Sequence, residues 1–268
     1  MQMITFVVGP PRSGTTLLQY MLCNSTGGEF LPECGAVWQV IHYRLKGIAE
    51  DYDHEPFDCD DHQLDASVTS FIKSLLGRPY RSENIILKAP NLCHYLDFLH
   101  RFFDRSMRTI CIIRDPRDAI ASLMKVRSRQ GLGRDLVAAA DFMGSFYQDL
   151  ARGLDHPHDD NPLFLIRYED LVSGSQERIE ALEAFVERPL DFGGFSDLTK
   201  ETMNKDNPWH SELYGRAVTA ERIGAFWDYL TPDEIGAIDH SYGRFYERFG
   251  YQAATDDELL AATKRQAA

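Results

Sequence analysis

The stretch of residues 4–16, with the sequence ITFVVGPPRSGTT, most constrains the fold, because it has the pattern of a strand, a tight turn and the start of a helix. Its first part is a short apolar run, which is typical of a parallel strand covered on both faces. Gly9 ends the run, and apolar residues recur at helical spacing after Gly14. The first N–H groups of a helix have no intrahelical acceptors and favour an anion. The sequence therefore predicts an anion-binding loop at residues 13–16.

The spacing of Gly9 and Gly14 matches the G-x-x-x-x-G-K-[ST] loop of nucleotide triphosphatases, but Thr15 occupies the lysine position. Arg12 is the only cation in this loop sequence. A kinase or triphosphatase would therefore lack the ammonium group that reaches the outer phosphates. The pattern still fits a loop that binds another phosphate group. The structural alternative is a loop that only starts a Rossmann-like helix.

A second strand-to-helix junction follows the apolar run at 109–113 and has the sequence RDPRDAIAS, from Arg114 to Ser122. Asp115 is suited to cap the following helix, and the proline after it suits the first helical position. Ser122 then lies about two turns into that helix. Arg114 and Ser122 are expected to face one point, where a guanidinium group and a hydroxyl could hold a terminal phosphate.

Together, the two motifs resemble those of sulfotransferases that use 3′-phosphoadenosine 5′-phosphosulfate (PAPS). The loop PRSGTT resembles their 5′-phosphosulfate-binding loop, in the variant with arginine found in tyrosylprotein sulfotransferases and bacterial relatives. The sequence RDPRDxxxS resembles their 3′-phosphate motif. The resemblance implies an α/β protein with a three-layer P-loop-like fold, in which helices flank a central parallel sheet. It also implies PAPS as co-substrate and no metal.

The resemblance further implies which residues bind the nucleotide. Those for the 5′-phosphosulfate are Arg12, Ser13, Gly14, Thr15 and Thr16. Arg114 and Ser122 would hold the 3′-phosphate. Tyr168, in the segment RYEDL, would lie near the adenine. Arg216 and Thr219 occupy the place of a loop that, in this family, returns to the 3′-phosphate.

The catalytic residues that we expect are Arg12, Lys88 and Glu33. Lys88 follows the apolar run 84–87, and therefore lies at the carboxyl end of a strand, where open α/β sheets bind ligands. Arg12 and Lys88 would neutralise the sulfate and the oxygen left on the departing nucleotide. The resemblance places the general base at Glu33, by its spacing from the loop arginine. The alternative bases are Glu29, His42 and His94.

Other segments have simpler interpretations. A fourth strand is expected at 163–166. Periodic apolar residues predict helices at 34–48, 67–76, 95–102, 135–154, 175–188 and 221–230. A capping box at Thr231 predicts one more helix, which ends at Gly250. The acidic stretch 51–65 is expected to be a solvated loop, and the irregular stretch 192–216 a lid over cofactor and acceptor. His156 and His158 are interpreted as solvated residues rather than metal ligands.

Composition limits the class of protein. The 268 residues, 44% of them hydrophobic, suffice for one domain, which we expect at 1–252 with a frayed tail at 253–268. No leader or membrane-spanning run is seen, which favours a cytoplasmic protein. The net charge of −13 argues against nucleic acid as a partner. The five cysteines are interpreted as reduced, without disulfide or metal spacing: Cys23, Cys34, Cys59, Cys93 and Cys111.

The resemblance therefore implies a sulfotransferase that moves a sulfuryl group in line from PAPS to a hydroxyl, phenol or amine, with a carboxylate as general base. An acidic surface and an aromatic-bearing lid favour a small-molecule acceptor, whose identity is not encoded in a recognisable motif. The oligomeric state is open, a homo-oligomer included. Two alternatives remain: a P-loop nucleotide-binding protein without transfer activity, and a small-molecule kinase.

Overall fold

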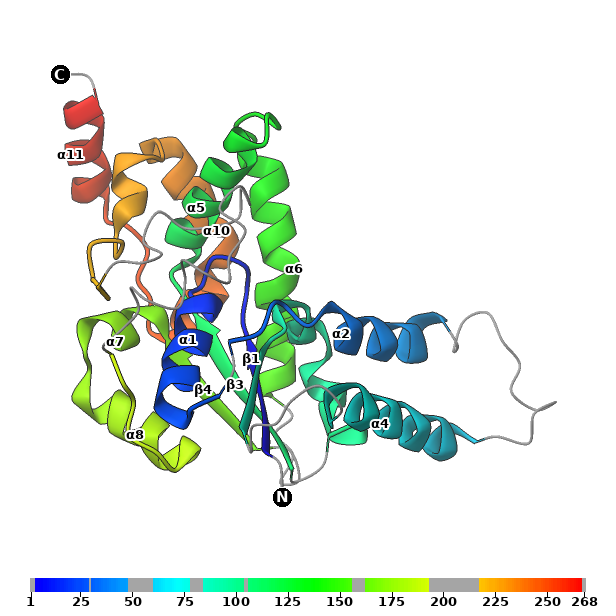
Figure 1. The fold of residues 1–268 in the computed structure, drawn as a ribbon. Helices are drawn as coiled ribbons and strands as arrows, with labels where there is room; N and C mark the ends of the chain where they lie inside the picture. The colour runs from blue at the N-terminus through cyan, green and yellow to red at the C-terminus, as the bar shows by residue number, and fades with distance from the viewer. Residues whose placement is uncertain are drawn as a thin grey trace.

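A computed structural model of the chain describes residues 3–28, 30–47, 60–77, 84–103, 106–155, 162–192 and 217–266. In these ranges, four parallel strands form the central sheet: β1 (Met3–Val8), β2 (Asn84–Lys88), β3 (Met107–Ile113) and β4 (Leu163–Arg167). Their order is β2-β1-β3-β4 (Figure 1). The predicted α/β class and the parallel sheet are confirmed.

Both faces of the sheet are buried, because side chains of successive strand residues enter two different cores. Phe6 and Val8 of β1 belong to a large core on one face, whereas Val7 belongs to a smaller core on the other. This double burial explains why the strands are continuous apolar runs. In β1, Val7 is paired with Lys88 of β2, and Val8 with Cys111 of β3. The carboxyl ends of the three strands therefore meet at one edge of the sheet.

Helices form a layer on each face. The smaller core is covered by α1 (Thr15–Thr26), α7 (Tyr168–Ser173) and α8 (Gln176–Val186). The larger core is covered chiefly by the 3₁₀ helix η3 (Pro90–Arg101), α5 (Pro116–Arg129), α6 (Leu136–Leu154) and α10 (Pro232–Phe249). Within the described ranges, no helix combines the length and the apolar character needed to cross a bilayer.

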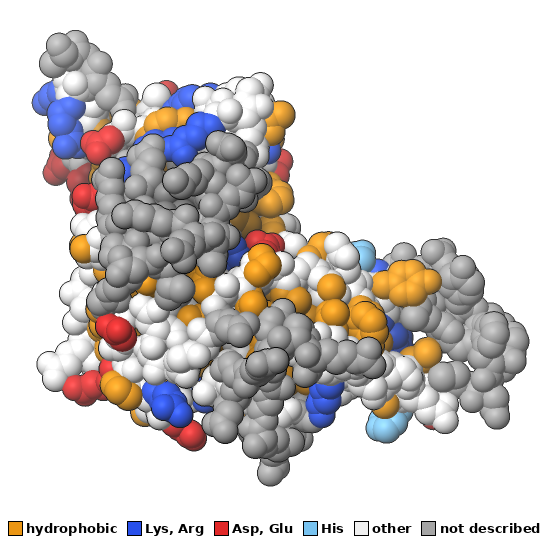
Figure 2. Space-filling view, in the orientation of Figure 1, with side chains coloured by type: hydrophobic (Ala, Val, Ile, Leu, Met, Phe, Trp, Pro, Cys, Tyr) orange, Lys and Arg blue, Asp and Glu red, His pale blue; other side chains and the backbone are white. Residues whose placement is uncertain are grey.

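Two helices form an arm that projects from the body: α2 (Gly35–His42), which continues into a π-helical turn at Tyr43–Gly47, and α4 (Asp61–Gly77) (Figure 1). On the face shown in Figure 2, hydrophobic side chains gather where this arm leaves the body. The expectation of a solvated loop at 51–65 is wrong for residues 61–65, which are helical. Residues 51–59 lie outside the described part of the chain.

A buried carboxylate joins the arm to the body, and this is why the acidic stretch is not simply solvated. Asp65 is buried, and its Oδ1 lies 2.9 Å from Nε of Arg44, which is buried as well. Its Oδ2 lies 2.6 Å from Nη2 of Arg101, at the end of η3. Asp65 therefore balances two arginines that come from different elements.

The C-terminal part combines one confirmed element with two differences. The capping box at Thr231 and the end of α10 at Gly250 are as predicted. The helix predicted at 221–230 is reduced to the 3₁₀ turn η4 (Ala225–Asp228), because Gly224 has a left-handed backbone with φ of 72°. In place of a frayed tail, the structure has α11 (Asp256–Gln266), in which Ala262 is buried.

Replacing Asp65 tests whether this carboxylate joins the arm to the body. We expect Asp65→Ala to lower the free energy of unfolding by about 3 kcal/mol, because it removes the buried charge partner of Arg44 and leaves this arginine only the exposed Asp61 as a described partner. Urea unfolding would measure the loss. The matched control is Asp61→Ala, which removes an exposed partner of the same arginine. We expect it to cost about 1 kcal/mol or less. Equal losses in both variants would show that burial of the pair is irrelevant.

Candidate active site

The loop between β1 and α1 has a backbone that two glycines make possible. Gly14 precedes α1 with φ of 93°, a left-handed conformation that residues with a Cβ rarely adopt. A Cβ on Gly14 would lie 2.7 Å from Cδ2 of Tyr168, and one on Gly9 would lie 2.1 Å from the carbonyl oxygen of Ile112. The loop is therefore pressed against the ends of β3 and β4. Arg12 is also left-handed, with φ of 70°.

The donors of the loop differ in their direction. Thr15 and Thr16 open α1, whose first internal hydrogen bond runs from the N–H of Leu18 to the carbonyl of Gly14. The N–H groups before Leu18 in the first turn thus face the loop side of the helix. The N–H of Ser13 is used within the turn, because it donates to the carbonyl of Pro10 at 3.1 Å. Its side chain is completely buried.

The two sequence motifs meet through their side chains. Nε of Arg12 donates to the hydroxyl of Ser122 at 3.0 Å, and Nη1 of Arg114 donates to the carbonyl of Arg12 at 3.4 Å. This contact arises because β1 and β3 are neighbours, so that the junctions after them share one edge of the sheet. Asp115 caps α5 as predicted, accepting from the N–H of Arg117 at 2.9 Å. Arg12, Arg114 and Ser122 therefore form one cluster.

Arg114 is buried and held from several sides. Its guanidinium carbon lies 4.4 Å from the ring centre of Tyr168, and its Nη2 donates to the carbonyl of Arg222. Nη2 also lies 3.4 Å from Oδ2 of Asp118. Its Nε is buried and has no hydrogen-bond partner among the described residues. An unsatisfied buried N–H on a cation is a donor suited to an anionic oxygen.

Burial shifts the pKa values of groups around this arginine. The pKa of Tyr168 is raised by burial, although the positive charge of Arg114 opposes the shift. Burial also raises the pKa of Asp118, again against the effect of Arg114. The pKa of Glu169 is raised by burial, while the N–H of Asp115 opposes the shift. Arg114 thus provides the positive charge in a buried corner of the site, which it shares with Asp118, Tyr168 and Glu169.

Lys88 and Glu33 lie together on the other side of the loop. Nζ of Lys88 donates to the hydroxyl of Thr16 at 3.3 Å and lies 3.4 Å from Oε2 of Glu33. The N–H of Cys34 donates to the carbonyl of Lys88 at 2.9 Å, which fixes the segment before α2 to the end of β2. The Glu33 side chain is 45% exposed, and that of Lys88 is 18% exposed. A carboxylate and an ammonium group therefore stand beside the helix start, open to a reactant.

The alternative bases are paired elsewhere or not described. Nδ1 of His42 contacts the hydroxyl of Tyr95, and Nδ1 of His94 lies 2.6 Å from Oδ2 of Asp149. The third alternative base, Glu29, lies outside the described residues. The same holds for four other features of the sequence: Arg216, His156, His158 and the expected lid from residue 193 to 216. The hydroxyl of Thr219 accepts from the N–H of Glu221 at 3.2 Å, within its own segment.

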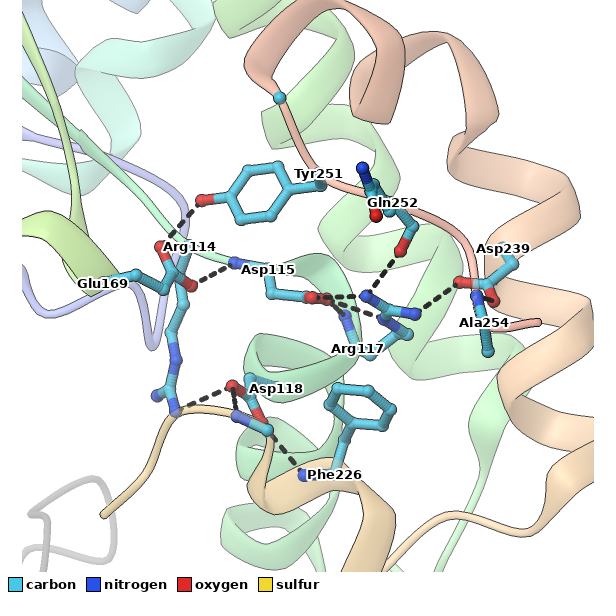
Figure 3. A network of polar contacts seen from close by, with 12 residues as sticks. Arg114, Asp115, Arg117, Asp118, Glu169, Phe226, Asp239, Tyr251, Gln252 and Ala254 are labelled. Carbon is cyan, nitrogen blue, oxygen red and sulfur yellow. Dashed lines mark hydrogen bonds and ion pairs between the residues drawn. The ribbon is translucent and has the colours of Figure 1, made fainter. Parts of the chain in front are cut away.

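The RDPRD motif also has structural partners that its sequence does not reveal (Figure 3). Arg117 is paired with Asp115 at 2.7 Å and with Asp239 of α10 at 3.3 Å. Glu169 accepts from the N–H of Asp115 and from the hydroxyl of Tyr251, both at 2.9 Å. Asp118 and Arg222 are the site residues that sequence reasoning missed. The position of Asp118 inside the motif was the only signal for it.

Comparison with known proteins identifies the family. The model of the sulfotransferase family matches residues 5–191 of this chain, which include both loops, Lys88 and Tyr168. No curated protein matches in a search by sequence.

Two sulfotransferase domains are among the solved structures with a similar fold. The sulfotransferase domain from the curacin biosynthetic pathway is 19% identical, with a TM-score of 0.61 over 95% of this chain and 99% of that domain. The sulfotransferase domain of the Synechococcus PCC 7002 olefin synthase is 18% identical, with a TM-score of 0.62 over 95% of this chain and 98% of that domain. These similarities concern the fold. With the family match over most of its length, the chain belongs to the sulfotransferase family.

Proposed function

We propose that this protein transfers a sulfuryl group from PAPS to a hydroxyl group of a small molecule, with a phenol or amine as related acceptors. Sulfuryl transfer in general follows from the family. The donor is supported by one observation above all: Arg12 of the first loop contacts Ser122 of the second motif at 3.0 Å. Two anion-binding elements that meet in this way suit a nucleotide with phosphates at two positions.

The residues present fit such a nucleotide. The first turn of α1 offers N–H groups and the Thr16 hydroxyl to the 5′-phosphosulfate, and Gly14 leaves room for its close approach. Arg114 offers a buried Nε without a described partner to the 3′-phosphate, and Ser122 adds a hydroxyl. The ring of Tyr168, stacked on Arg114, would lie beside the adenine. Arg222 is a further cation next to this corner, since its carbonyl accepts from Arg114 and its positive charge opposes the rise in the pKa of Tyr168.

PAPS supplies a sulfuryl group whose departure leaves negative charge on the nucleotide phosphate. Lys88 is positioned to stabilise that charge, because its Nζ already contacts Thr16 at the start of α1. Arg12 adds a second positive charge at the loop. Fixed cations of this kind act without reorganisation, because the fold holds them in place before the reaction.

Glu33 is proposed as the general base for the acceptor hydroxyl. Its carboxylate is partly exposed, so an acceptor can reach it, and it lies 3.4 Å from Lys88, so the proton acceptor is next to the charge-stabilising cation. The acceptor would lie between Glu33 and the sulfuryl group, in line with the bond that breaks. The proton leaves the hydroxyl for a Glu33 oxygen as the new O–S bond forms.

A thermal-shift experiment tests the proposed donor. Adenosine 3′,5′-bisphosphate (PAP) should raise Tm in the presence of EDTA, because a ligand that binds only the folded state stabilises it. At about one hundred times Kd the gain is about 2.7 kcal/mol. Protection only by ATP with Mg²⁺ would favour a kinase instead. Protection by PAP without sulfation of any member of a broad panel of alcohols, phenols and amines would favour a binding protein without transfer activity.

Gly14→Ala should abolish PAP protection. An alanine at this position must adopt a left-handed φ, which costs about 1 kcal/mol. Its Cβ would also lie 2.7 Å from the Tyr168 ring, so the loop must shift away from the nucleotide. The matched control is Gly133→Ala, which has φ of 74° and open space around its Cβ. That variant should lose a similar amount of backbone stability and keep the full PAP response. Unchanged PAP binding by Gly14→Ala would show that the loop does not hold the nucleotide.

Glu33→Gln should lower kcat by about 100-fold or more, because the amide cannot accept the proton, and leave the Kd for PAP within about twofold. Radiolabelled PAPS and the best acceptor from the panel would give kcat, and calorimetry would give Kd. Glu177→Gln, at an exposed position of α8, is the control and should retain normal kcat. Full activity of Glu33→Gln would remove this carboxylate from the mechanism.

A further inference from the structure

Asp118 is a buried carboxylate whose acceptor atoms serve a distant segment of the chain. Its Oδ2 accepts from the N–H of Gly224 and its Oδ1 from the N–H of Phe226, both at 2.9 Å. Its side chain is only 1% exposed. Figure 3 shows it pointing from the first turn of α5 towards the turn that carries Phe226. Asp118 thus caps η4 from another helix.

The same carboxylate faces Arg114. Nη2 of Arg114 lies 3.4 Å from Oδ2 of Asp118 and also donates to the carbonyl of Arg222. The guanidinium group of Arg114 therefore bridges Asp118 of α5 and the carbonyl of Arg222 in the segment 217–226. Asp118 contacts this guanidinium and also accepts hydrogen bonds from the same segment. The segment lies beyond residue 191, where the match to the family model ends.

We propose that Asp118 is a positioning residue for recognition of the 3′-phosphate. It fixes the direction of the Arg114 guanidinium and holds the segment 217–226 beside it, so that both form one wall of this subsite. The proposal rests on the proposed function, because it concerns the phosphate that distinguishes PAPS from other adenine nucleotides.

A purely structural role would give a different result. The segment is also anchored by packing, because Phe226 is buried and lies under Arg117, with 4.5 Å between the guanidinium carbon and the ring centre. Loss of a structural cap would lower stability and affect all nucleotides alike. Loss of positioning would affect only nucleotides that carry a 3′-phosphate.

Calorimetric affinities for PAP and for adenosine 5′-monophosphate (AMP) separate these roles. Asp118→Asn should weaken PAP binding at least tenfold and leave AMP binding within twofold. Asp118→Asn removes a negative charge beside Arg114, and this change alone would strengthen the binding of an anion. Weaker binding of PAP would therefore have the opposite sign to the charge effect and would indicate lost positioning. An equal change for both nucleotides, or tighter PAP binding, would overturn the proposal.

The matched control is Asp239→Asn. Asp239 is a largely buried carboxylate, with its side chain 9% exposed, that contacts Arg117 and the N–H of Ala254 but has no described contact with Arg114 or the segment 217–226. This variant should unfold more easily and keep the wild-type ratio of PAP to AMP affinity. A ratio that falls tenfold here too would show that any loss of buried charge has this effect, and would overturn the proposal.

Hydrogen exchange on the wild-type protein provides a test that does not depend on whether a variant folds. At equal saturation, PAP should slow exchange of amides in 217–226 at least tenfold more than AMP does. Equal protection by both nucleotides would overturn the role of Asp118. A wild-type protein that binds PAP no more tightly than AMP would instead overturn the proposed PAPS function, and this inference with it.

Discussion

The contact between Arg12 and Ser122 depends on the order of the strands, and it brings the two sequence motifs together. Because β1 and β3 are neighbours in the parallel sheet, the turns that follow them start from the same edge. Each turn opens a helix, and each brings a cation. The sheet thus converts two local sequence patterns, about one hundred residues apart, into a single cluster of positive charge.

The concentration of charge explains how a chain with a net charge of −13 can suit an anionic ligand. The arginines of the second motif are buried, and each forms an ion pair with its own carboxylates. Arg114 is paired with Asp118, and Arg117 with Asp115 and Asp239. Buried charges that are paired in this way stay in fixed positions, although each pair adds little net stability. The acidic surface elsewhere does not cancel this field, because interactions between exposed charges are screened over about 10 Å.

The sequence predicted the elements whose causes are local. The apolar strands, the Asp115 cap and the Thr231 capping box depend on neighbouring residues, and all three are observed. Several errors concern residues whose partners are distant. Asp65 belongs to an acidic stretch in the sequence, but Arg44 and Arg101 make it an internal ion pair. The tail forms α11 and buries Ala262, which its polar composition did not indicate. The N–H groups of Gly224 and Phe226, from which Asp118 accepts, lie about one hundred residues away, so no local pattern indicates them.

The hydrogen bond from the N–H of Cys34 to the carbonyl of Lys88 attaches the start of α2 to the sheet, whereas the rest of α2 belongs to the arm. At its N-terminal end, the chain that carries Glu33 is fastened to the rigid sheet, and the distance between carboxylate and ammonium is set there. Farther along, the same helix leaves the body as part of the arm, away from that constraint (Figure 1). A substitution in the distal part of the arm is therefore expected to leave the separation of Glu33 and Lys88 unchanged.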